Sequence, residues 1–180
     1  MVERVHLVGD SARPTRVVED PHEIDNPILE FFVSYWARKR ETNGLPRYAS
    51  FVPKEVKQHL PWVVVSDALP DYEDFRYRVV GSRVAQYFLG DGTGKTIREA
   101  FEGLDAQFVE GVLWLNRQTC VERVPIRLTA HATVQNEIYF PACDTIYLPY
   151  STDGIVADKV VNVFTFSLQS MVKRIGANLS

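Results

Sequence analysis

Apolar and polar residues follow a strand-like pattern in two neighbouring stretches of the chain. Residues 62–69 read WVVVSDAL, a β-branched run that predicts a strand. Residues 73–82 alternate two sets of side chains: Phe75, Tyr77 and Val79 against Arg76, Arg78 and Val80. This alternation predicts a second strand with the aromatic set on one face. Residues 70–73, PDYE, predict a turn between them, so we expect an antiparallel hairpin.

Three more strands are expected at the end of the chain. Residues 125–134 alternate apolar with polar side chains, and the pattern continues through residues 137–150 and 156–169. Gln135 and Asn136 are suited to the first turn between these strands, and the STDG sequence at 151–154 to the second.

Helical periodicity fills the remaining regions. Residues 26–44 carry Ile28, Phe32, Tyr35 and Trp36 on one face, which predicts an amphipathic helix. Its expected boundary residues are Asn26 as the N-cap, Pro27 in the first turn and Gly44 just past the end.

Four further helical segments are expected, at residues 53–61, 82–89, 96–101 and 104–123. The last repeats Leu104, Phe108, Val112 and Leu115 along one face, which predicts packing against a sheet. The order is a helix, two strands, several helices and three strands. It predicts an α+β fold, a five-stranded antiparallel sheet with the helices of the insert on one face.

The glycine-rich residues 90–96, GDGTGKT, invite comparison with a phosphate-binding loop. That loop requires two glycines separated by four residues, and counting back from Gly94 the first would fall on Leu89. The preceding residues also have helical rather than strand spacing. We therefore interpret the glycines as a tight turn that needs positive φ.

Composition narrows the class of protein. The chain has 180 residues, 46% of them hydrophobic and 24% charged, with a formal net charge of −3. This predicts one globular domain without the basic surface that nucleic acid requires. No apolar run approaches the length of a membrane span, and the first residues do not resemble a secretory signal. We expect a cytoplasmic protein in which Cys120 and Cys143 are buried thiols, although a bridge between them is an alternative.

A set of short motifs in a fixed order points to a family. They are Leu45-Pro46-Arg47, Val52-Pro53, Leu60-Pro61, FRYRVVGS at 75–82, Thr93-Gly94-Lys95, Leu148-Pro149 and Asp153-Gly154. The order and the predicted elements resemble a bacterial single-domain PAS-like family with R-Y-R-x-x-G-[ST] and T-G-[RK] motifs. The resemblance covers residues 45–169. Here Ser82 replaces threonine, Gly92 replaces an apolar residue, and Lys95 replaces arginine.

The resemblance implies a domain organisation and a function. We expect a partly flexible lead-in at 1–24 with a short strand at 2–8, a flanking helix at 25–44, a PAS-like domain at 45–170 and a tail at 171–180. The family implies a sensory or signalling module that binds a small ligand or a protein partner and is not an enzyme. Since only a short tail follows residue 169, we expect no output domain, so the signal would pass to another chain.

The resemblance also implies where a ligand would bind, between the inner face of the sheet and the helical insert. The candidate lining residues are Tyr77, Val79, Phe101, Phe108, Val112, Leu115, Leu128, Ala130, Tyr147 and Phe164. The alternative is that these side chains simply pack together. Arg76, Arg78 and Lys95 are candidates for binding an anion, and the alternative for the arginines is structural pairing with acidic residues or solvent exposure.

No cofactor is predicted, although an unidentified small molecule is compatible with the family. The histidines are His6, His22, His59 and His131. None lies in the insert, where haem-binding PAS domains place their axial ligand, and His131 is expected to face away from it. Cys120 lacks the surroundings of a flavin-reactive cysteine, and no metal-ligand spacing or G-x-S-x-G nucleophile motif is present.

The predicted first helix exposes Phe31, Phe32, Tyr35 and Trp36, an aromatic surface that needs a partner. It would either pack on the outer face of its own sheet or form a homodimer, and flanking helices in many PAS proteins favour the dimer. Two other classes stay open: an enzyme on a related cone-shaped antiparallel α+β scaffold, and a purely structural dimerisation module.

Overall fold

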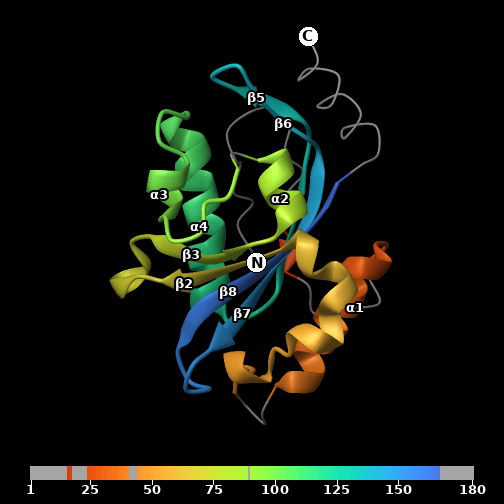
Figure 1. Ribbon diagram of the computed structural model, residues 1–180. Coiled ribbons are helices and arrows are strands. Elements are labelled where there is room, and N and C mark those ends of the chain that lie inside the picture. The colour runs from red at the N-terminus through yellow and green to blue at the C-terminus, as the bar shows by residue number, and fades with distance from the viewer. Residues whose placement is uncertain (1–15, 18–23, 41–43, 89, 167–180) are drawn as a thin grey trace.

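An antiparallel sheet forms the centre of the protein (Figure 1). The computed structural model describes residues 16–17, 24–40, 44–88 and 90–166, so the strand predicted at 2–8 and the C-terminal tail lie outside the described residues. In spatial order the strands are β1 (Arg16–Val17), β4 (Ile126–Ala130), β7 (Cys143–Ser151), β8 (Ala157–Phe166), β2 (Val63–Ala68) and β3 (Phe75–Val80). The five strands predicted from the pattern are all present, and the two-residue β1 adds an edge beside β4.

Two of the predicted strands are each broken in two. The polypeptide leaves the main sheet after β4 and forms a separate hairpin of β5 (Thr133–Gln135) and β6 (Ile138–Phe140). Asn136 and Glu137, both at positive φ, make the turn one residue later than predicted. Pro141 lies between β6 and β7. Because proline has no backbone N–H to donate, it interrupts the strand that was predicted over residues 137–150.

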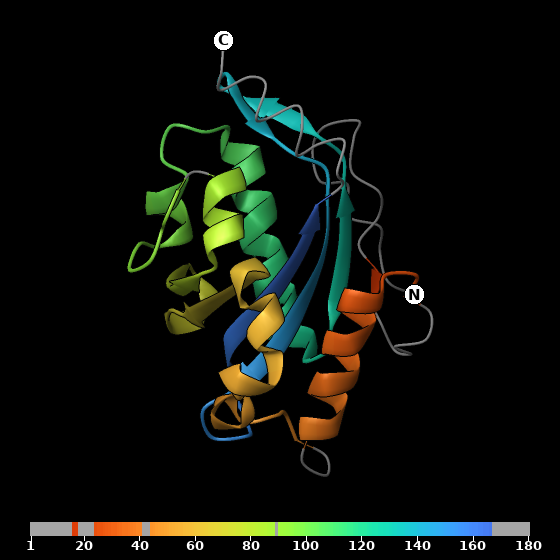
Figure 2. The same ribbon diagram turned by 45° about the vertical axis from the view of Figure 1, so that its right-hand side comes forward.

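Helices cover both faces of the sheet (Figure 2). The insert between β3 and β4 contains α2 (Ser82–Tyr87), α3 (Ile97–Ala100) and α4 (Ala106–Glu122), as the periodicity predicted. The opposite face carries α1 (Pro27–Lys39). The segment from α1 to β2 contains the 3₁₀ helices η2 (Tyr48–Ser50) and η3 (Pro53–Trp62), and η4 (Pro70–Tyr72) lies in the β2–β3 turn.

Helix α1 begins where the sequence predicts. The Asn26 side chain accepts hydrogen bonds from the backbone N–H groups of Ile28 and Leu29, and Pro27 occupies the first turn. The buried face of the helix is Leu29, Phe32, Val33, Tyr35 and Trp36. Leu29 and Val33 were not expected there, and Ile28, which was, is only partly buried.

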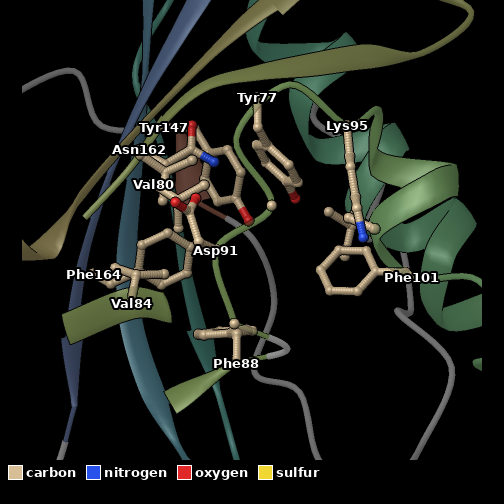
Figure 3. A pocket seen from close by; sticks show the side chains of 15 residues that line it. Tyr77, Val80, Val84, Phe88, Asp91, Lys95, Phe101, Tyr147, Asn162 and Phe164 are labelled. Atoms are coloured by element: carbon tan, nitrogen blue, oxygen red, sulfur yellow. The ribbon is translucent and has the colours of Figure 1, made fainter. Parts of the chain in front are cut away.

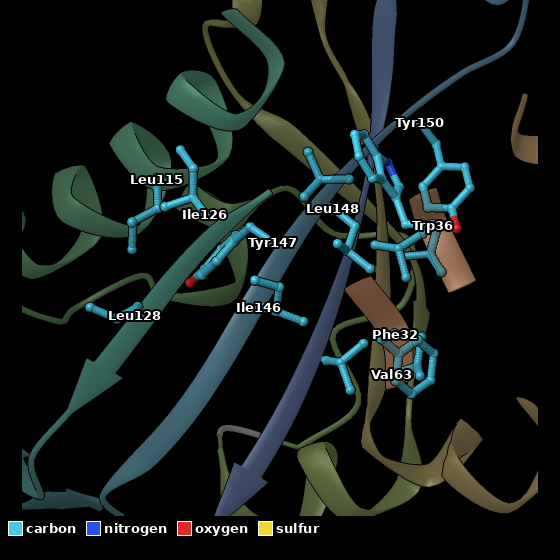
Figure 4. Close-up of a cluster of buried hydrophobic side chains, with 14 of the residues drawn as sticks. Phe32, Trp36, Val63, Leu115, Ile126, Leu128, Ile146, Tyr147, Leu148 and Tyr150 are labelled. Atoms are coloured by element: carbon cyan, nitrogen blue, oxygen red, sulfur yellow. The ribbon is translucent and has the colours of Figure 1, made fainter. Parts of the chain in front are cut away.

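The aromatic surface of α1 packs on its own sheet. The indole Nε1 of Trp36 donates to the backbone oxygen of Pro149 in β7 at 2.6 Å, and Leu148 and Tyr150 lie on the same side of the sheet (Figure 4). Phe32, Tyr35 and Trp36 are all buried, and the Tyr35 ring packs edge-on against Phe51. Of the two arrangements considered from the sequence, packing within the chain is therefore the one observed. Assembly into a homodimer stays a prediction.

A polar cluster fixes the start of α1 to three strands. Asp144 in β7 accepts hydrogen bonds from Arg127 in β4 at 2.8 and 2.6 Å and from the Asn26 amide at 3.2 Å. Asn26 also donates to Thr165 in β8, and Arg127 reaches Asp25 at 2.7 Å. The hydrogen bonds to Asp144, and then those to Asp25, raise the pKa of Arg127.

The hairpin of β2 and β3 contains a β-bulge that changes which residues face the insert. Val65 pairs with Val79, but Ser66 pairs with Tyr77, so Arg78 is an extra residue on β3. The simple alternation of this strand is broken at that point.

The bulge makes one face assignment from the sequence wrong. Val79 was expected beside Tyr77 on the inner face, but it lies on the other side of the bulge and is 44% exposed. Val80, expected on the opposite face, takes the inner position with Tyr77. A period of two cannot continue across an inserted residue.

We predict that Trp36→Ala destabilises the protein by about 3–5 kcal/mol, because it removes a buried indole and leaves a cavity between α1 and the sheet. Denaturant unfolding at a fixed protein concentration measures this change. Arg38→Ala, on the exposed side of the same helix, is the control and should change the free energy of unfolding by less than about 0.5 kcal/mol. Equal effects of the two substitutions would show that α1 is not docked on this sheet.

Candidate ligand-binding site

Two adjoining cavities lie between the inner face of the sheet and the helical insert. The first has a volume of about 90 Å³ and lies beneath α2 and the glycine loop. The second has a volume of about 120 Å³ and lies between α4 and the strands β4, β6 and β7. Four residues line both: Phe88, Val112, Tyr147 and Phe164.

Asn162 is the most unusual residue of the first cavity. It lies in the middle of β8, opposite Tyr147 on one side and Val64 on the other, and all three line the cavity. Asn162 is only 5% exposed, and its Oδ1 has no hydrogen-bond partner among the described residues. Buried amide groups are normally paired, so this one is available to a molecule in the cavity.

Two phenols share the cavity with Asn162. Figure 3 shows Tyr77 from β3 and Tyr147 from β7 with their rings turned toward the same space. Burial raises the pKa of both hydroxyls, with a smaller contribution from Asp74 at Tyr77 and from Cys143 at Tyr147. Both phenols are therefore neutral at physiological pH, and each has a proton to donate.

The glycine loop forms the mouth of the first cavity and is a turn, as the sequence analysis concluded. Asp91 accepts hydrogen bonds from the backbone N–H and the hydroxyl of Thr93. The loop then pairs with β3, because Gly94 N–H donates to the Tyr77 oxygen at 2.8 Å and Tyr77 N–H donates to the Lys95 oxygen at 2.9 Å. Gly94 needs the positive φ of 87° that it adopts.

Gly92, a departure from the family motif, has a local explanation. A Cβ atom at this position would lie 3.2 Å from the Cδ2 atom of Tyr77. The absence of a side chain therefore gives the Tyr77 ring the room it occupies at the cavity wall.

The three candidate anion-binding residues have different surroundings. Arg76 donates to the Gly94 oxygen at 2.7 Å and so supports the glycine loop. Arg78 pairs with Asp67 at 3.1 Å on the outer side of the sheet. Lys95 is exposed and lines the mouth of the first cavity. Both arginines thus have the structural contacts that were their alternative, and only Lys95 borders a cavity.

The second cavity is mainly aromatic and aliphatic. Phe108, Leu115, Leu128, Ala130 and Phe140 supply its walls. Its polar lining groups are Gln107, His131, Thr133, Gln135, Cys143 and Thr145. The prediction that His131 faces away from the insert is wrong, since it borders this cavity. The strand alternation that predicted its direction ends at Ala130, where β4 stops.

Most of the candidate ligand-binding residues lie together at the cavity walls. Nine of the ten candidate residues line one or both cavities, namely Tyr77, Phe101, Phe108, Val112, Leu115, Leu128, Ala130, Tyr147 and Phe164. Val79 does not. Asn162, Val84 and Phe88 also line the first cavity and were not predicted from the sequence. Asn162 had a readable signal, because it is a lone amide within the apolar run VVNVF of a predicted strand.

The two cysteines are free thiols and do not form a bridge. Burial raises the pKa of Cys120 to about 12 and that of Cys143 to about 11. A thiol that keeps its proton is a poor nucleophile. Cys120 is a buried core residue, whereas Cys143 is half-buried and lines the second cavity.

Within the described ranges, no group of three or more His, Cys, Asp or Glu residues is placed to hold a metal ion. Likewise, no helix in the described part of the chain is long and apolar enough to cross a membrane.

The fold and its cavities define an α+β module that encloses a small, mainly apolar chamber between an antiparallel sheet and a helical insert. The family model described as PAS domain matches residues 24–161, and the chain therefore belongs to the PAS domain family. The match includes α1, the insert and the strands from β2 to β7, and it ends within β8, one residue before Asn162. A comparison with curated proteins found no match. Membership of this family suggests a sensory or signalling module.

We predict that iodoacetamide at pH 8 leaves both thiols of the folded protein largely unmodified, whereas both react in denaturant. The reason is that burial keeps the folded thiols protonated, while unfolded cysteine ionises near pH 8.5. The two thiols consequently stabilise the fold below that pH, and their contribution is lost as pH rises toward about 11 to 12. Mass spectrometry measures the labelling, and rapid modification of Cys143 in the folded protein would contradict this prediction.

Proposed function

We propose that this protein is a PAS sensory module that binds a small molecule between its sheet and its helical insert and reports the binding to a partner chain. The observation that carries this proposal is the amide of Asn162, which is 95% buried at the wall of the first cavity with an unpaired Oδ1.

Energetics favour a ligand at this position. A buried polar atom without a partner costs about 1–3 kcal/mol, and leucine would fill the same volume in a strand at no such cost. A ligand that pairs with the amide recovers that free energy only when it binds. The neutral phenols of Tyr77 and Tyr147 supply further hydrogen-bond donors at the same wall.

The two faces of β7 and β8 offer a short route from the cavity to the outside. Tyr147 faces the insert, and its neighbour Leu148 packs on the side of α1 with Trp36 (Figure 4). Asn162 is likewise followed by Val163, which pairs with Ile146 on the α1 side. A ligand that displaces these strands therefore also displaces the surface on which α1 rests.

The partner is a protein that contacts α1 or the sheet edge, and a second copy of this chain is one candidate. The buried aromatic residues of α1 leave its solvent-facing side, which includes Ala37 and Arg38, for such a contact.

We favour a sensor over an enzyme because Asp74, the buried carboxylate whose charge acts on the Tyr77 hydroxyl, already has hydrogen-bond partners. Asp74, whose charge contributes to the raised pKa of Tyr77, accepts hydrogen bonds from the backbone N–H groups of Phe75 and Ile97. It therefore serves to join β3 to α3 and does not form the Tyr–Asp catalytic pair that an enzyme on this scaffold would need.

We predict that native mass spectrometry of the purified protein detects a retained small molecule and that Asn162→Leu abolishes the retention. The same substitution should raise the free energy of unfolding of the empty protein by about 1 kcal/mol, since it removes an unpaired buried amide. Ser66→Ala is the matched control. Its hydroxyl is also buried and unpaired but lines neither cavity, so its removal should leave ligand retention unchanged.

Two results would contradict the proposal. One is a protein that stays empty over several preparations from its natural host. The other is an Asn162→Leu variant that loses stability and keeps the ligand, which would make Asn162 a structural residue.

A further inference from the structure

The sizes of the two cavities limit what one of them can hold alone. An apolar cavity of about 150 Å³ is known to bind benzene. The first cavity has about 90 Å³ and the second about 120 Å³, so each is smaller than that. They share four wall residues, and together they exceed the benzene-sized volume. A benzene-sized ligand therefore does not fit within either cavity alone, and a larger one can use the space of both.

The two cavities differ in their unpaired polar groups. The first has at its wall the phenol of Tyr77 and the buried Oδ1 atom of Asn162, which lacks a partner. The second also has polar residues at its wall, but among the described residues none of them has a buried side-chain nitrogen or oxygen without a partner, and Phe108, Phe140, Leu115 and Leu128 give it a large apolar surface. A molecule that fits both has a hydrogen-bonding end in the first cavity and an apolar body in the second.

Phe88 stands where the two cavities meet. Its ring lies 5.3 Å from that of Phe164 and 5.6 Å from that of Phe140, both in edge-on contact. These rings make the boundary between the two cavities aromatic, which suits an alkyl or aryl group better than a polar one.

Charge at the mouth argues against an anionic ligand. Lys95 borders the first cavity, but Asp91 borders it too, and hydrogen bonds from Thr93 hold the pKa of Asp91 below its usual value. One positive and one negative group therefore face the opening. Deeper in, the lining holds amide, phenol and apolar groups, and an unpaired carboxylate there would be strongly disfavoured.

We infer that the ligand is an uncharged amphiphile whose head both donates and accepts hydrogen bonds at Asn162, Tyr77 and Tyr147, and whose apolar body passes Phe88 into the second cavity. A half-turn of the Asn162 amide exchanges its donor and acceptor with little change of shape, so it can pair with either side of such a head. This inference rests on the proposed function and names the class of ligand for the same site.

Linear primary amides test the inference directly. Butanamide, hexanamide and octanamide have the same neutral head and differ only in their apolar length, and binding is measured by calorimetry and by protein chemical shifts. Because each buried methylene contributes a nearly constant free energy, we expect affinity to rise about tenfold or more for each two-carbon step. Octanoate, which has the same length and a charged head, should bind at least tenfold more weakly than octanamide.

A pair of alanine variants locates the apolar body. Ala130→Leu places a larger side chain in the second cavity and should remove the gain from butanamide to octanamide while butanamide binds as before. Ala132→Leu is the control, because Ala132 is exposed two residues away and lines neither cavity. The chain-length series on the unaltered protein is independent of whether either variant folds.

The outcomes separate this inference from the proposed function. Amide binding that does not depend on chain length, or octanoate binding more tightly than octanamide, overturns the ligand class and leaves a sensor for another molecule. Failure of all amides together with a retained molecule in native mass spectrometry has the same meaning. Failure of the amides together with an empty protein overturns both.

Discussion

The pairing of β7 with β8 is the constraint on which the rest of the structure depends. The two strands run antiparallel from Cys143 and Phe166 to Ser151 and Ala157, and both are buried on two faces. One face of this pair of strands lines the cavities, and α1 packs on the other face (Figure 4). Most residues in these strands must therefore pack against either the insert or the first helix, and the partly exposed ones lie toward the strand ends.

Within that constraint Asn162 is an exception with a cost. Val160, Val161 and Val163 around it are fully buried aliphatic residues, as a central strand requires. An amide at this position weakens the core unless something pairs with it, and sites of function are where such local inconsistencies are expected. The cost is small beside the apolar contacts of the two strands, so the fold tolerates it.

Most of the fold could be predicted from the sequence, but fewer details of the candidate site could. The types of the elements could be predicted from the hydrophobic period and the capping residues. These predictions covered the helix that begins at Asn26, five of the six strands of the main sheet and the three helices of the insert. The bulge at Arg78 could not be predicted. A bulge is defined by how two strands pair, and the alternation of side chains along one strand does not reveal it. It moved Val79 out of the lining and Val80 into it. The break after Ala130 misplaced His131 for a similar reason, since a strand's end is set by its neighbours.

The geometry of β7 also places the cavity wall close to the contacts that hold α1 on the opposite face of the sheet. Successive residues of a strand point to opposite faces, so a ligand at Tyr147 is one peptide unit from Leu148 and two from the Pro149 oxygen that Trp36 binds. The other end of α1 is held by Asp144, three residues before Tyr147 in the same strand. Both anchors of the helix thus lie within three residues of the cavity wall on β7. Under the proposed function, a ligand that shifts that strand would therefore move both contacts that hold α1.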